Sequence, residues 1–360
     1  MDTIILMLGT HKGAFFLRSS RDRTKWELEG PSLRGYPVEY LMADHRRELT
    51  LYASVTNSFY GPQLHLSKDL GRNWEPVQES PRFAEGRGKT VARIWVIEPG
   101  TRQEPDILFA GVDPGALFVS HDRGRHWKEV HTLTDHPTRS KWFPGQGGMC
   151  LHSILIDPEN SDRMWVAVSA AGVFFTEDGG LTWAPRNQGI RAEFLPHHYP
   201  EVGQCVHKIM AHPDHPDRIF LQNHGGVYRT EDGGQTWEAI EAQLPAVFGF
   251  PVLVHPREPE TVFIIPLVSA EERYVPQGRL SVYRSRDGGR TWECSTRGLP
   301  QKDAWLNVFR QAFTADSLQP CGVYFGTSTG QVFASLDSGE SWAQLADFLP
   351  PILSVRVCLA

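Results

Sequence analysis

The sequence has few of the features that mark secreted, membrane or nucleic-acid-binding proteins. Its 360 residues include five scattered cysteines, an odd number that provides no disulfide framework and favours a reducing compartment. No apolar run approaches the roughly 18 residues of a membrane span. The net charge is -6 without a Lys/Arg tract, so the basic surface of a nucleic-acid binder is missing. We therefore expect a cytoplasmic protein that binds neither nucleic acid nor membranes.

The N-terminal stretch MDTIILMLGTHKG also lacks the features of a signal peptide. Asp2 stands where a positive charge is needed, and no small-residue cleavage site follows. Convincing amphipathic helices are absent as well, whereas short runs of Val, Ile, Phe and Trp broken by Gly and Pro indicate strands throughout. The first residues are therefore expected to begin a strand.

What the sequence does contain is an eight-residue motif that recurs along its length. The clear copies are SKDLGRNW (67–74), SHDRGRHW (120–127), TEDGGLTW (176–183), TEDGGQTW (230–237), SRDGGRTW (285–292) and SLDSGESW (335–342). A degenerate copy, SRDRTKW (20–26), lacks the glycine. Counting this copy, the aspartates lie 47 to 56 residues apart, a spacing that suits a four-stranded propeller blade.

Each position of the motif has a physical role in a turn. The aspartate accepts hydrogen bonds from backbone N–H groups, and the preceding Ser or Thr hydroxyl braces the same loop. Glycine supplies a left-handed backbone, and tryptophan is expected to be buried between neighbouring blades. These structural residues are Asp69, Asp122, Asp178, Asp232, Asp287 and Asp337, with Trp74, Trp127, Trp183, Trp237, Trp292 and Trp342.

This S/T-x-D-x-G-x-T/S-W signature resembles the Asp-box, or BNR, repeat of the sialidase-like superfamily. The resemblance covers almost the whole chain and implies that each box is a turn between the third and fourth strands of a blade, facing away from an active site. The sialidase catalytic signature is missing, because no Arg-Ile-Pro stretch occurs. The resemblance therefore fits a glycosyl hydrolase-like BNR-repeat protein better than a sialidase.

We predict an all-β fold, a single seven-bladed β-propeller of four-stranded antiparallel blades over residues 1–360. Its first blade is formed by 1–31 and 351–360, so that the N- and C-terminal strands pair and close the ring. The other blades are predicted at 36–78, 90–131, 150–187, 205–241, 250–296 and 306–346.

If the boxes lie on one face, the long connections 128–149, 184–204 and 267–278 lie on the other, where binding is usually placed. Histidines also gather there. Cys150-Leu-His152 and Cys205-Val-His207 begin two equivalent inner strands, in which residues i and i+2 share a side. Aligning the inner strands on their ends places Glu39, Arg93 and either Arg310 or Gln311 at the level of these histidines.

The first functional hypothesis is a small polar ligand bound at this histidine-rich channel mouth. The candidate catalytic residues are His152, His207, Glu201 and Arg93, and the candidate ligand-binding residues are Glu39, His197, His198, Tyr199, His224, Arg310 and Trp142. No cofactor is required, but a variant places a zinc-like ion on Cys150, His152, Cys205 and His207. In the structural alternative, the cysteines are buried hydrophobes and the histidines plug the channel.

Two further hypotheses remain open. Glycoside hydrolysis is implied by the resemblance, with Tyr199 and Glu201, or Tyr274 and Glu271, as a nucleophile pair and Arg93, Arg273 and Arg310 as an arginine triad. Alternatively, the propeller binds a protein partner without catalysis, through loop residues such as Trp142 and Phe143. A deep polar pit would favour a small molecule, and a broad apolar rim would favour a partner.

Overall fold

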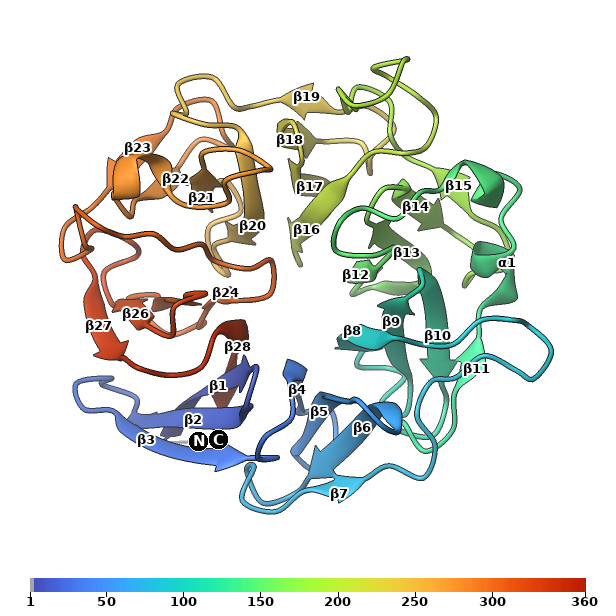
Figure 1. The fold of residues 1–360 in the computed structure, drawn as a ribbon, viewed down its shortest axis with the longest axis horizontal. Coiled ribbons are helices and arrows are strands. Elements are labelled where there is room, and N and C mark those ends of the chain that lie inside the picture. The colour runs from blue at the N-terminus through green and yellow to red at the C-terminus, as the bar shows by residue number, and fades with distance from the viewer. Residues whose placement is uncertain (1–2) are drawn as a thin grey trace.

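The computed structural model describes residues 3–360, which form seven four-stranded antiparallel sheets arranged as the blades of a closed ring (Figure 1). This confirms the predicted seven-bladed propeller. Blade 1 contains β28 (Ile352–Leu359), β1 (Thr3–Thr10), β2 (Gly13–Ser20) and β3 (Glu27–Ser32), from the channel outwards. Met1 and Asp2, which the prediction includes in this blade, lie outside the described residues.

The other six blades follow in chain order, each running from the inner to the outer strand. Blade 2 contains β4 (Val38–Asp44), β5 (Thr50–Asn57), β6 (Gly61–Ser67) and β7 (Glu75–Pro76); blade 3 contains β8 (Arg93–Pro99), β9 (Leu108–Asp113), β10 (Ala116–Ser120) and β11 (Lys128–Glu129). Blade 4 contains β12 (Leu151–Asp157), β13 (Asn160–Val168), β14 (Gly172–Thr176) and β15 (Ala184–Pro185); blade 5 contains β16 (Val206–His212), β17 (His215–Asn223), β18 (Gly226–Thr230) and β19 (Glu238–Ala239). Blade 6 contains β20 (Phe248–Val254), β21 (Val262–Leu267), β22 (Val282–Ser285) and β23 (Glu293–Ser295); blade 7 contains β24 (Phe313–Ala315), β25 (Val323–Gly326), β26 (Val332–Ser335) and β27 (Ala343–Ala346).

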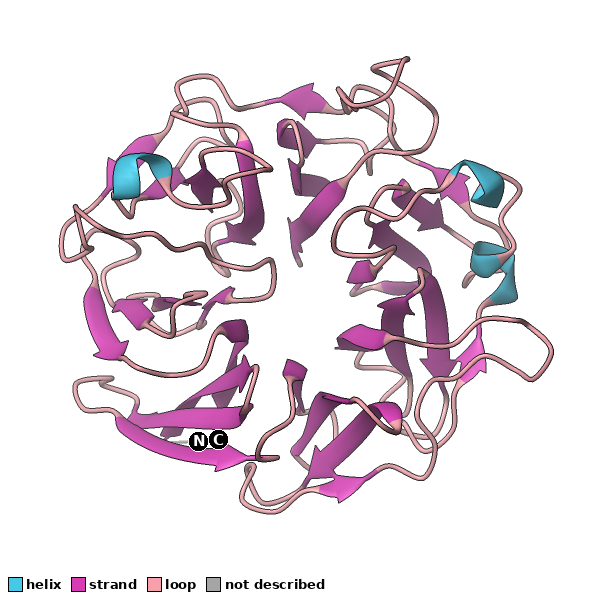
Figure 2. Cartoon of the chain, viewed as in Figure 1, coloured by secondary structure: helices cyan, strands magenta, loops and turns pink. Residues whose placement is uncertain are grey.

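Helical structure in the described chain is confined to three short turns in the connections: α1 (His131–Thr134), η1 (Arg139–Lys141) and η2 (Pro276–Gly278) (Figure 2). Within residues 3–360, no helix has the length and apolar character required to span a membrane.

The ring is closed by the pairing of β28 with β1, as the sequence predicts. The register runs antiparallel from Ile4 opposite Leu359 to Thr10 opposite Ile352. Thr3, the first residue of β1, and Ala360, which follows β28, exchange two backbone hydrogen bonds of 3.0 and 2.9 Å. Both long edges of β1 are thus paired, one with β28 and the other with β2, so the N-terminal strand has no free edge.

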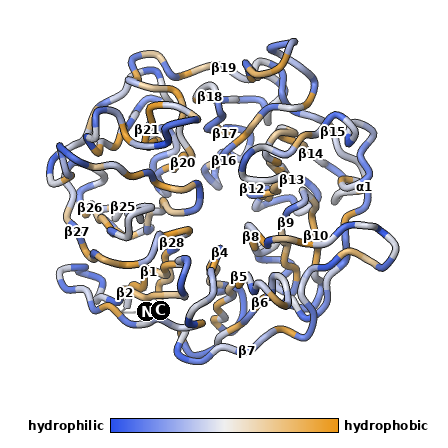
Figure 3. Tube along the Cα trace, viewed as in Figure 1, coloured by the Kyte–Doolittle hydropathy of each residue, from blue (hydrophilic) through white to orange (hydrophobic). Residues whose placement is uncertain are grey.

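The hydrophobic core follows the strands, and hydrophilic residues collect in the connecting loops (Figure 3). Phe263, Tyr324, Phe325 and Phe333 are among the largest fully buried side chains. They belong to one cluster that extends from blade 6 through blade 7 to blade 1. Packing between neighbouring blades, rather than within each blade alone, therefore forms the core.

The Asp boxes lie between the third and fourth strands of their blades and have the predicted hydrogen bonds. In blade 2, Ser67 Oγ donates to Asp69 Oδ1 at 2.8 Å, and the Asn73 backbone N–H donates to the same oxygen at 2.8 Å. Gly71 has a φ of +85° and donates its N–H to Ser67 Oγ. Equivalent bonds recur in the other five clear boxes.

The box tryptophans do not all link blades, which refines the prediction that they are buried between them. The indole N–H groups of Trp237, Trp292 and Trp342 donate to the preceding blade, at Arg186 O, Ile240 O and Ser295 Oγ. Trp74 and Trp127 are only half-buried, and their indoles donate to Gly71 O and Gly124 O within their own turns. The indole contacts between blades are thus concentrated in blades 4 to 7.

We expect Trp292→Ala to lower the free energy of unfolding by about 3–5 kcal/mol, because it removes a large buried ring from the junction of blades 5 and 6. Trp292 is 9% exposed and its indole donates to Ile240 O at 2.8 Å. Urea denaturation measures the change. The control Phe59→Ala removes a ring that is 89% exposed and should change stability by less than about 0.5 kcal/mol.

The boxes also predict an acid-dependent loss of stability. Hydrogen bonds from Thr182, and then from Thr176, lower the pKa of Asp178 from 3.8 to about 2. A carboxyl group with a lowered folded-state pKa stabilises the fold fully above its unfolded-state pKa and loses that contribution as the pH falls. The urea midpoint should therefore decrease between about pH 4 and pH 2, and less steeply in Asp178→Asn. Glu177→Gln, at the exposed neighbouring residue, should follow the wild-type profile; equal slopes for all three proteins would refute the prediction.

Candidate functional site

A cavity of about 460 Å³ opens at the channel mouth, where the inner strands begin. Since strands alternate in direction, the turns after the third strands, which carry the Asp boxes, lie at the opposite end of each blade. The cavity is lined by His11, Glu39, Arg93, Trp95, Phe143 to Gly148, Ser169, Ala170, Phe194, Leu195, Gly203, Cys205, His207, His224, Phe248, Phe250, Ala270, Glu271, Arg273, Phe309, Arg310, Gln311 and Leu353.

Most inner strands have a β-bulge near their first residue, and the side chain of a residue in that bulge lines the cavity. Glu39, Trp95, His207, Phe250 and Leu353 each fall at a shift in the pairing register, where they have no partner on the adjacent strand. A bulge bends the strand and re-aims the side chain of the extra residue. The ring of bulges therefore directs side chains from five different blades into one cavity.

The bulge in blade 3 corrects the sequence alignment of that blade. Trp95, not Arg93, occupies the position equivalent to His207, because the irregularity lies between Ile94 and Val96. Arg93 begins the strand two residues earlier and still lines the cavity. The sequence alignment matched the inner strands at the Pro that ends them. Arg93 was therefore placed at the level of His207, because the alignment assumed that all inner strands have the same length.

His152 is the exception among the bulge residues, and its predicted place at the mouth needs correction. It is fully buried: Nε2–H donates to Val206 O at 2.9 Å, and Nδ1 pairs with Ser153 Oγ at 3.0 Å. Burial lowers its pKa well below 6.5. Cys150 is also buried and donates to Ser169 Oγ at 3.2 Å. The predicted four-residue Cys150, His152, Cys205 and His207 metal cluster is therefore not assembled.

Other predicted residues lie in the loops outside the cavity wall. Trp142 is 4% exposed, stacks near His136 and Phe174, and donates its indole N–H to Thr138 Oγ1 at 3.0 Å. It packs the loop onto blade 4, which corrects its assignment as a ligand-binding residue. The exposed residues His197, His198 and Tyr199 do not line the cavity, and Glu201 forms a surface ion pair with Lys141 at 3.3 Å.

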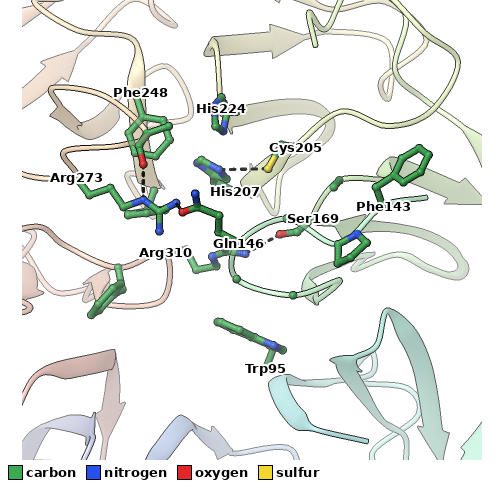
Figure 4. A pocket seen from close by; sticks show the side chains of 18 of the residues that line it. Trp95, Phe143, Gln146, Ser169, Cys205, His207, His224, Phe248, Arg273 and Arg310 are labelled. Carbon is green, nitrogen blue, oxygen red and sulfur yellow. Dashed lines mark hydrogen bonds between the residues drawn. The ribbon is translucent and has the colours of Figure 1, made fainter. Parts of the chain in front are cut away.

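The three long connections do contribute to the cavity. Residues 143–148 come from the connection before blade 4, and Phe194 and Leu195 come from the one before blade 5. Ala270, Glu271 and Arg273 come from blade 6. Arg273, which has a φ of +51°, donates to Gln146 Oε1 across the cavity (Figure 4). Loops from two sides of the ring are thereby joined over the mouth.

The cavity contains more positive than negative groups, and two of its arginines lack an acidic partner. Arg93 Nε lies 3.8 Å from Glu39 Oε1. Among residues 3–360, no carboxylate oxygen lies within 4.0 Å of the guanidinium nitrogens of Arg273 or Arg310. Arg310 instead donates to Ser169 Oγ at 3.0 Å and lies 5.2 Å from the Trp95 ring centroid. This arrangement can accept an anion.

Below the cavity, polar side chains occupy the channel; the sequence analysis named Gln311 among them as an alternative to Arg310 but did not identify the others. Lys208 Nζ donates to Gln311 Oε1 at 2.6 Å, and Gln311 Nε2 donates to His152 O at 2.6 Å. Burial lowers the pKa of Lys208 to about 7. Tyr40 donates to Glu98 at 2.7 Å, and Arg356 lies 3.7 Å from the same carboxylate. The structural alternative predicted that histidines plug the channel. The polar side chains found there are instead mostly lysine, glutamine and arginine.

Cys205, His207 and His224 form the remaining chemical feature of the wall. One donor atom from each lies within 4.8 Å of the other two (Figure 4). Burial raises the pKa of Cys205 and lowers the pKa of both imidazoles. Neutral imidazoles keep a lone pair, so this group has the donor set of a transition-metal site.

The aromatic wall is what the sequence analysis overlooked most. Trp95, Phe248, Phe250 and Phe309 line the cavity, yet in the sequence they read as ordinary core residues of strands. Only the register shifts, which pairing reveals, separate Trp95 and Phe250 from the buried aromatics beside them.

Comparison with known proteins supports the architecture. The family model described as BNR-Asp box repeat matches residues 117–130, which include the blade 3 box. Among curated proteins, the oligoxyloglucan-reducing end-specific xyloglucanase of Emericella nidulans is 28% identical over 149 residues, which are 40% of this chain and 16% of that protein. The photosystem II stability/assembly factor HCF136 of Arabidopsis thaliana is 24% identical over 229 residues, 62% of this chain and 48% of the relative. The matched regions thus span less than half of these relatives.

Solved structures share the fold at low sequence identity. An ancestral GH74 enzyme superimposes with a TM-score of 0.58 at 15% identity, covering 89% of this chain and 38% of that chain. YCF48 from Cyanidioschyzon merolae superimposes with a TM-score of 0.51 at 15% identity, covering 92% of each. The chain therefore contains a match to the BNR-Asp box repeat at residues 117–130, and its propeller is similar in fold to a GH74 enzyme and to YCF48.

Truncation of two adjacent loop residues, Trp142 and Phe143, should lower the free energy of unfolding by very different amounts. Trp142→Ala empties a buried site and should cost about 3–5 kcal/mol of unfolding free energy. Phe143 lies at the cavity wall and is 58% exposed. Phe143→Ala should therefore lower the free energy of unfolding by less than about 0.5 kcal/mol. Urea denaturation of both variants provides the measurement, and similar losses would contradict the division between loop packing and cavity lining.

Proposed function

We propose that the protein binds a small organic carboxylate in the channel-mouth cavity. The observation that carries the proposal is the pair of guanidinium groups, Arg273 and Arg310, that face an aromatic-walled cavity without an acidic partner among the described residues. Guanidinium groups recognise carboxylates through paired hydrogen bonds, and low surrounding polarity strengthens that attraction. The rings of Trp95, Phe248 and Phe250 offer faces for the apolar part of the same ligand.

Charge and enclosure favour this ligand class over a neutral one or a protein surface. Three arginines face only two cavity carboxylates, Glu39 and Glu271, so one negative charge from a ligand would balance the wall. The aromatic groups line an open-mouthed cavity of about 460 Å³, which matches a small molecule better than a flat partner surface does. A ring-shaped acid, such as a sugar acid or an aromatic acid, satisfies both features.

Calorimetric titration of paired acidic and neutral compounds tests the proposal. Glucuronate should bind at least about tenfold more tightly than glucose, and benzoate more tightly than benzyl alcohol, a difference of about 1.4 kcal/mol per tenfold. Arg310→Gln should remove this preference, because it removes the unpaired charge. Arg72→Gln, at an exposed box residue on the opposite face, should retain it. Equal affinity for acids and their neutral counterparts would reject the proposal.

Glycoside hydrolysis is the second candidate, and the similarity to the xyloglucanase of Emericella nidulans favours it. Burial raises the pKa of Asp113, which lies directly beneath Gly148 of the cavity wall, as a general acid requires. By contrast, neither proposed Tyr/Glu pair lines the cavity together, since only Glu271 does so.

Hydrolysis of xyloglucan oligosaccharides and nitrophenyl glycosides tests this candidate. Turnover by the wild type should fall roughly 100-fold or more in Asp113→Asn, since general acid catalysis contributes about 10²–10⁴-fold. Glu104→Gln, in an outer loop of the same blade, serves as the control for altered charge. Absence of turnover by the wild type leaves carboxylate binding as the function without hydrolysis.

A further inference from the structure

We propose that Cys205 Sγ, His207 Nε2 and a ring nitrogen of His224 bind Zn²⁺, with the fourth coordination position open to the cavity. The three residues come from the start of β16 and from the turn between β17 and β18. All three line the cavity, so a ligand in the fourth position would be reached from the channel mouth.

The distances suit tetrahedral zinc. Cys205 Sγ and His207 Nε2 are 3.6 Å apart. With a Zn–S distance of about 2.3 Å and a Zn–N distance of about 2.0–2.1 Å, a tetrahedral S···N edge is about 3.5 Å. The same separation also fits a hydrogen bond between thiol and imidazole, so the third residue is decisive: the His224 donor lies within 4.8 Å of both atoms.

The contacts behind the donors hold them in a ligating arrangement. His207 Nδ1–H donates to Gly249 O at 2.6 Å, which leaves the Nε2 lone pair directed toward Cys205. Such an outer hydrogen bond to a carbonyl is the usual support of a metal-bound histidine. The His224 backbone N–H donates to Cys205 O at 3.0 Å and thereby links the turn to the strand that carries the other two ligands.

Phenylalanine rings of the cavity wall lie against the two imidazoles. Phe248 lies 5.3 Å from both imidazole centroids, Phe250 lies 5.1 Å from that of His207, and Phe194 lies 5.5 Å from that of His224. An apolar shell limits the water available to the donors, and it strengthens a metal–thiolate bond relative to one in solvent. The three donor atoms therefore lie in a mainly apolar part of the cavity wall.

Blade 4 contains the same positions in a form that cannot bind metal, which gives an internal comparison. Cys150, His152 and Ser169 correspond to Cys205, His207 and His224, and the backbone bond from Ser169 N to Cys150 O repeats at 2.9 Å. Here a hydroxyl replaces the third imidazole, and both His152 nitrogens are already hydrogen-bonded. Arg310 also places its positive charge 3.3 Å from Cys150 Sγ. Of these two blades, only blade 5 brings three donor atoms together at the cavity wall.

The charges define what the fourth position would accept. The thiolate of Cys205 contributes one negative charge against the two positive charges of Zn²⁺, and Arg273 and Arg310 add further positive charge around the site. An anionic ligand in the fourth position would reduce this excess. Nevertheless, the metal site depends on its own three side chains and not on the carboxylate proposed above, so each can be tested without the other.

Spectroscopic titration with cobalt(II) and calorimetry with zinc chloride test the site on the full chain after chelator treatment. We expect one equivalent of metal per chain, with a thiolate-to-cobalt charge-transfer band and the intense visible bands of tetrahedral Co²⁺. Cys205→Ser should remove the charge-transfer band, and both Cys205→Ser and His224→Ala should weaken zinc binding roughly 100-fold or more, since each removes a ligand. Cys150→Ser, the matched change in blade 4, should retain the band and the affinity.

Three outcomes would overturn the proposal: no stoichiometric cobalt spectrum, a charge-transfer band that persists in Cys205→Ser, or equal losses in Cys150→Ser and Cys205→Ser. His224→Ala changes a half-buried turn residue, so its unfolding midpoint separates loss of a ligand from loss of the fold. Titration of glucuronate into the metal-free protein reports on the arginines alone. Failure of the metal site and failure of carboxylate binding are therefore distinguishable.

Discussion

The pairing of β28 with β1 is the constraint on which the remaining architecture depends. It fixes the position of the inner strand of blade 1 and thereby the circumference that the other inner strands must share. It also positions Leu353 at the cavity and Ser354 beside Gln311 of blade 7. The cavity is consequently assembled from segments at both ends of the described chain and from most blades between them.

Within this ring, the strands serve two demands that conflict locally. An inner strand must pair along its length to support its blade, yet the cavity requires side chains that turn out of the sheet. The bulges reconcile these demands by leaving one residue unpaired at the start of the strand. Blade 4 shows that the irregularity alone is insufficient, because His152 occupies its bulge but is held by Val206 O. The neighbouring blade therefore determines whether an unpaired residue becomes available to a ligand.

The sequence was sufficient for the fold because the box residues act locally: each Asp, Gly and Ser or Thr sets its own turn, so spacing counts the blades. The site was only partly predictable. Glu39, Arg93, His207, His224 and Arg310 were identified from strand ends and loops, and they line the cavity. Trp95 and Phe250 were not, because an extra residue in a strand is invisible without its partner strand. Trp142 was assigned to binding because it lies in a long loop. Its burial could not be predicted, because burial of a loop residue depends on tertiary contacts that the local sequence does not encode.

The indole hydrogen bonds of the Asp boxes determine how neighbouring blades are linked around the ring. The indole N–H groups of Trp237, Trp292 and Trp342 donate hydrogen bonds to the preceding blade. Those of Trp74 and Trp127 donate to carbonyl groups within their own turns. The arc from blade 4 to blade 7 is therefore linked through box indoles, whereas blades 2 and 3 are joined by Arg46, which donates to Glu104 O and Ile107 O, and by Tyr52, which donates to Arg123 O. The cavity wall that carries the cysteine and imidazoles is thus secured by buried indoles, and the wall that carries Glu39 and Trp95 is secured by arginine and tyrosine side chains that bind backbone carbonyls of the next blade.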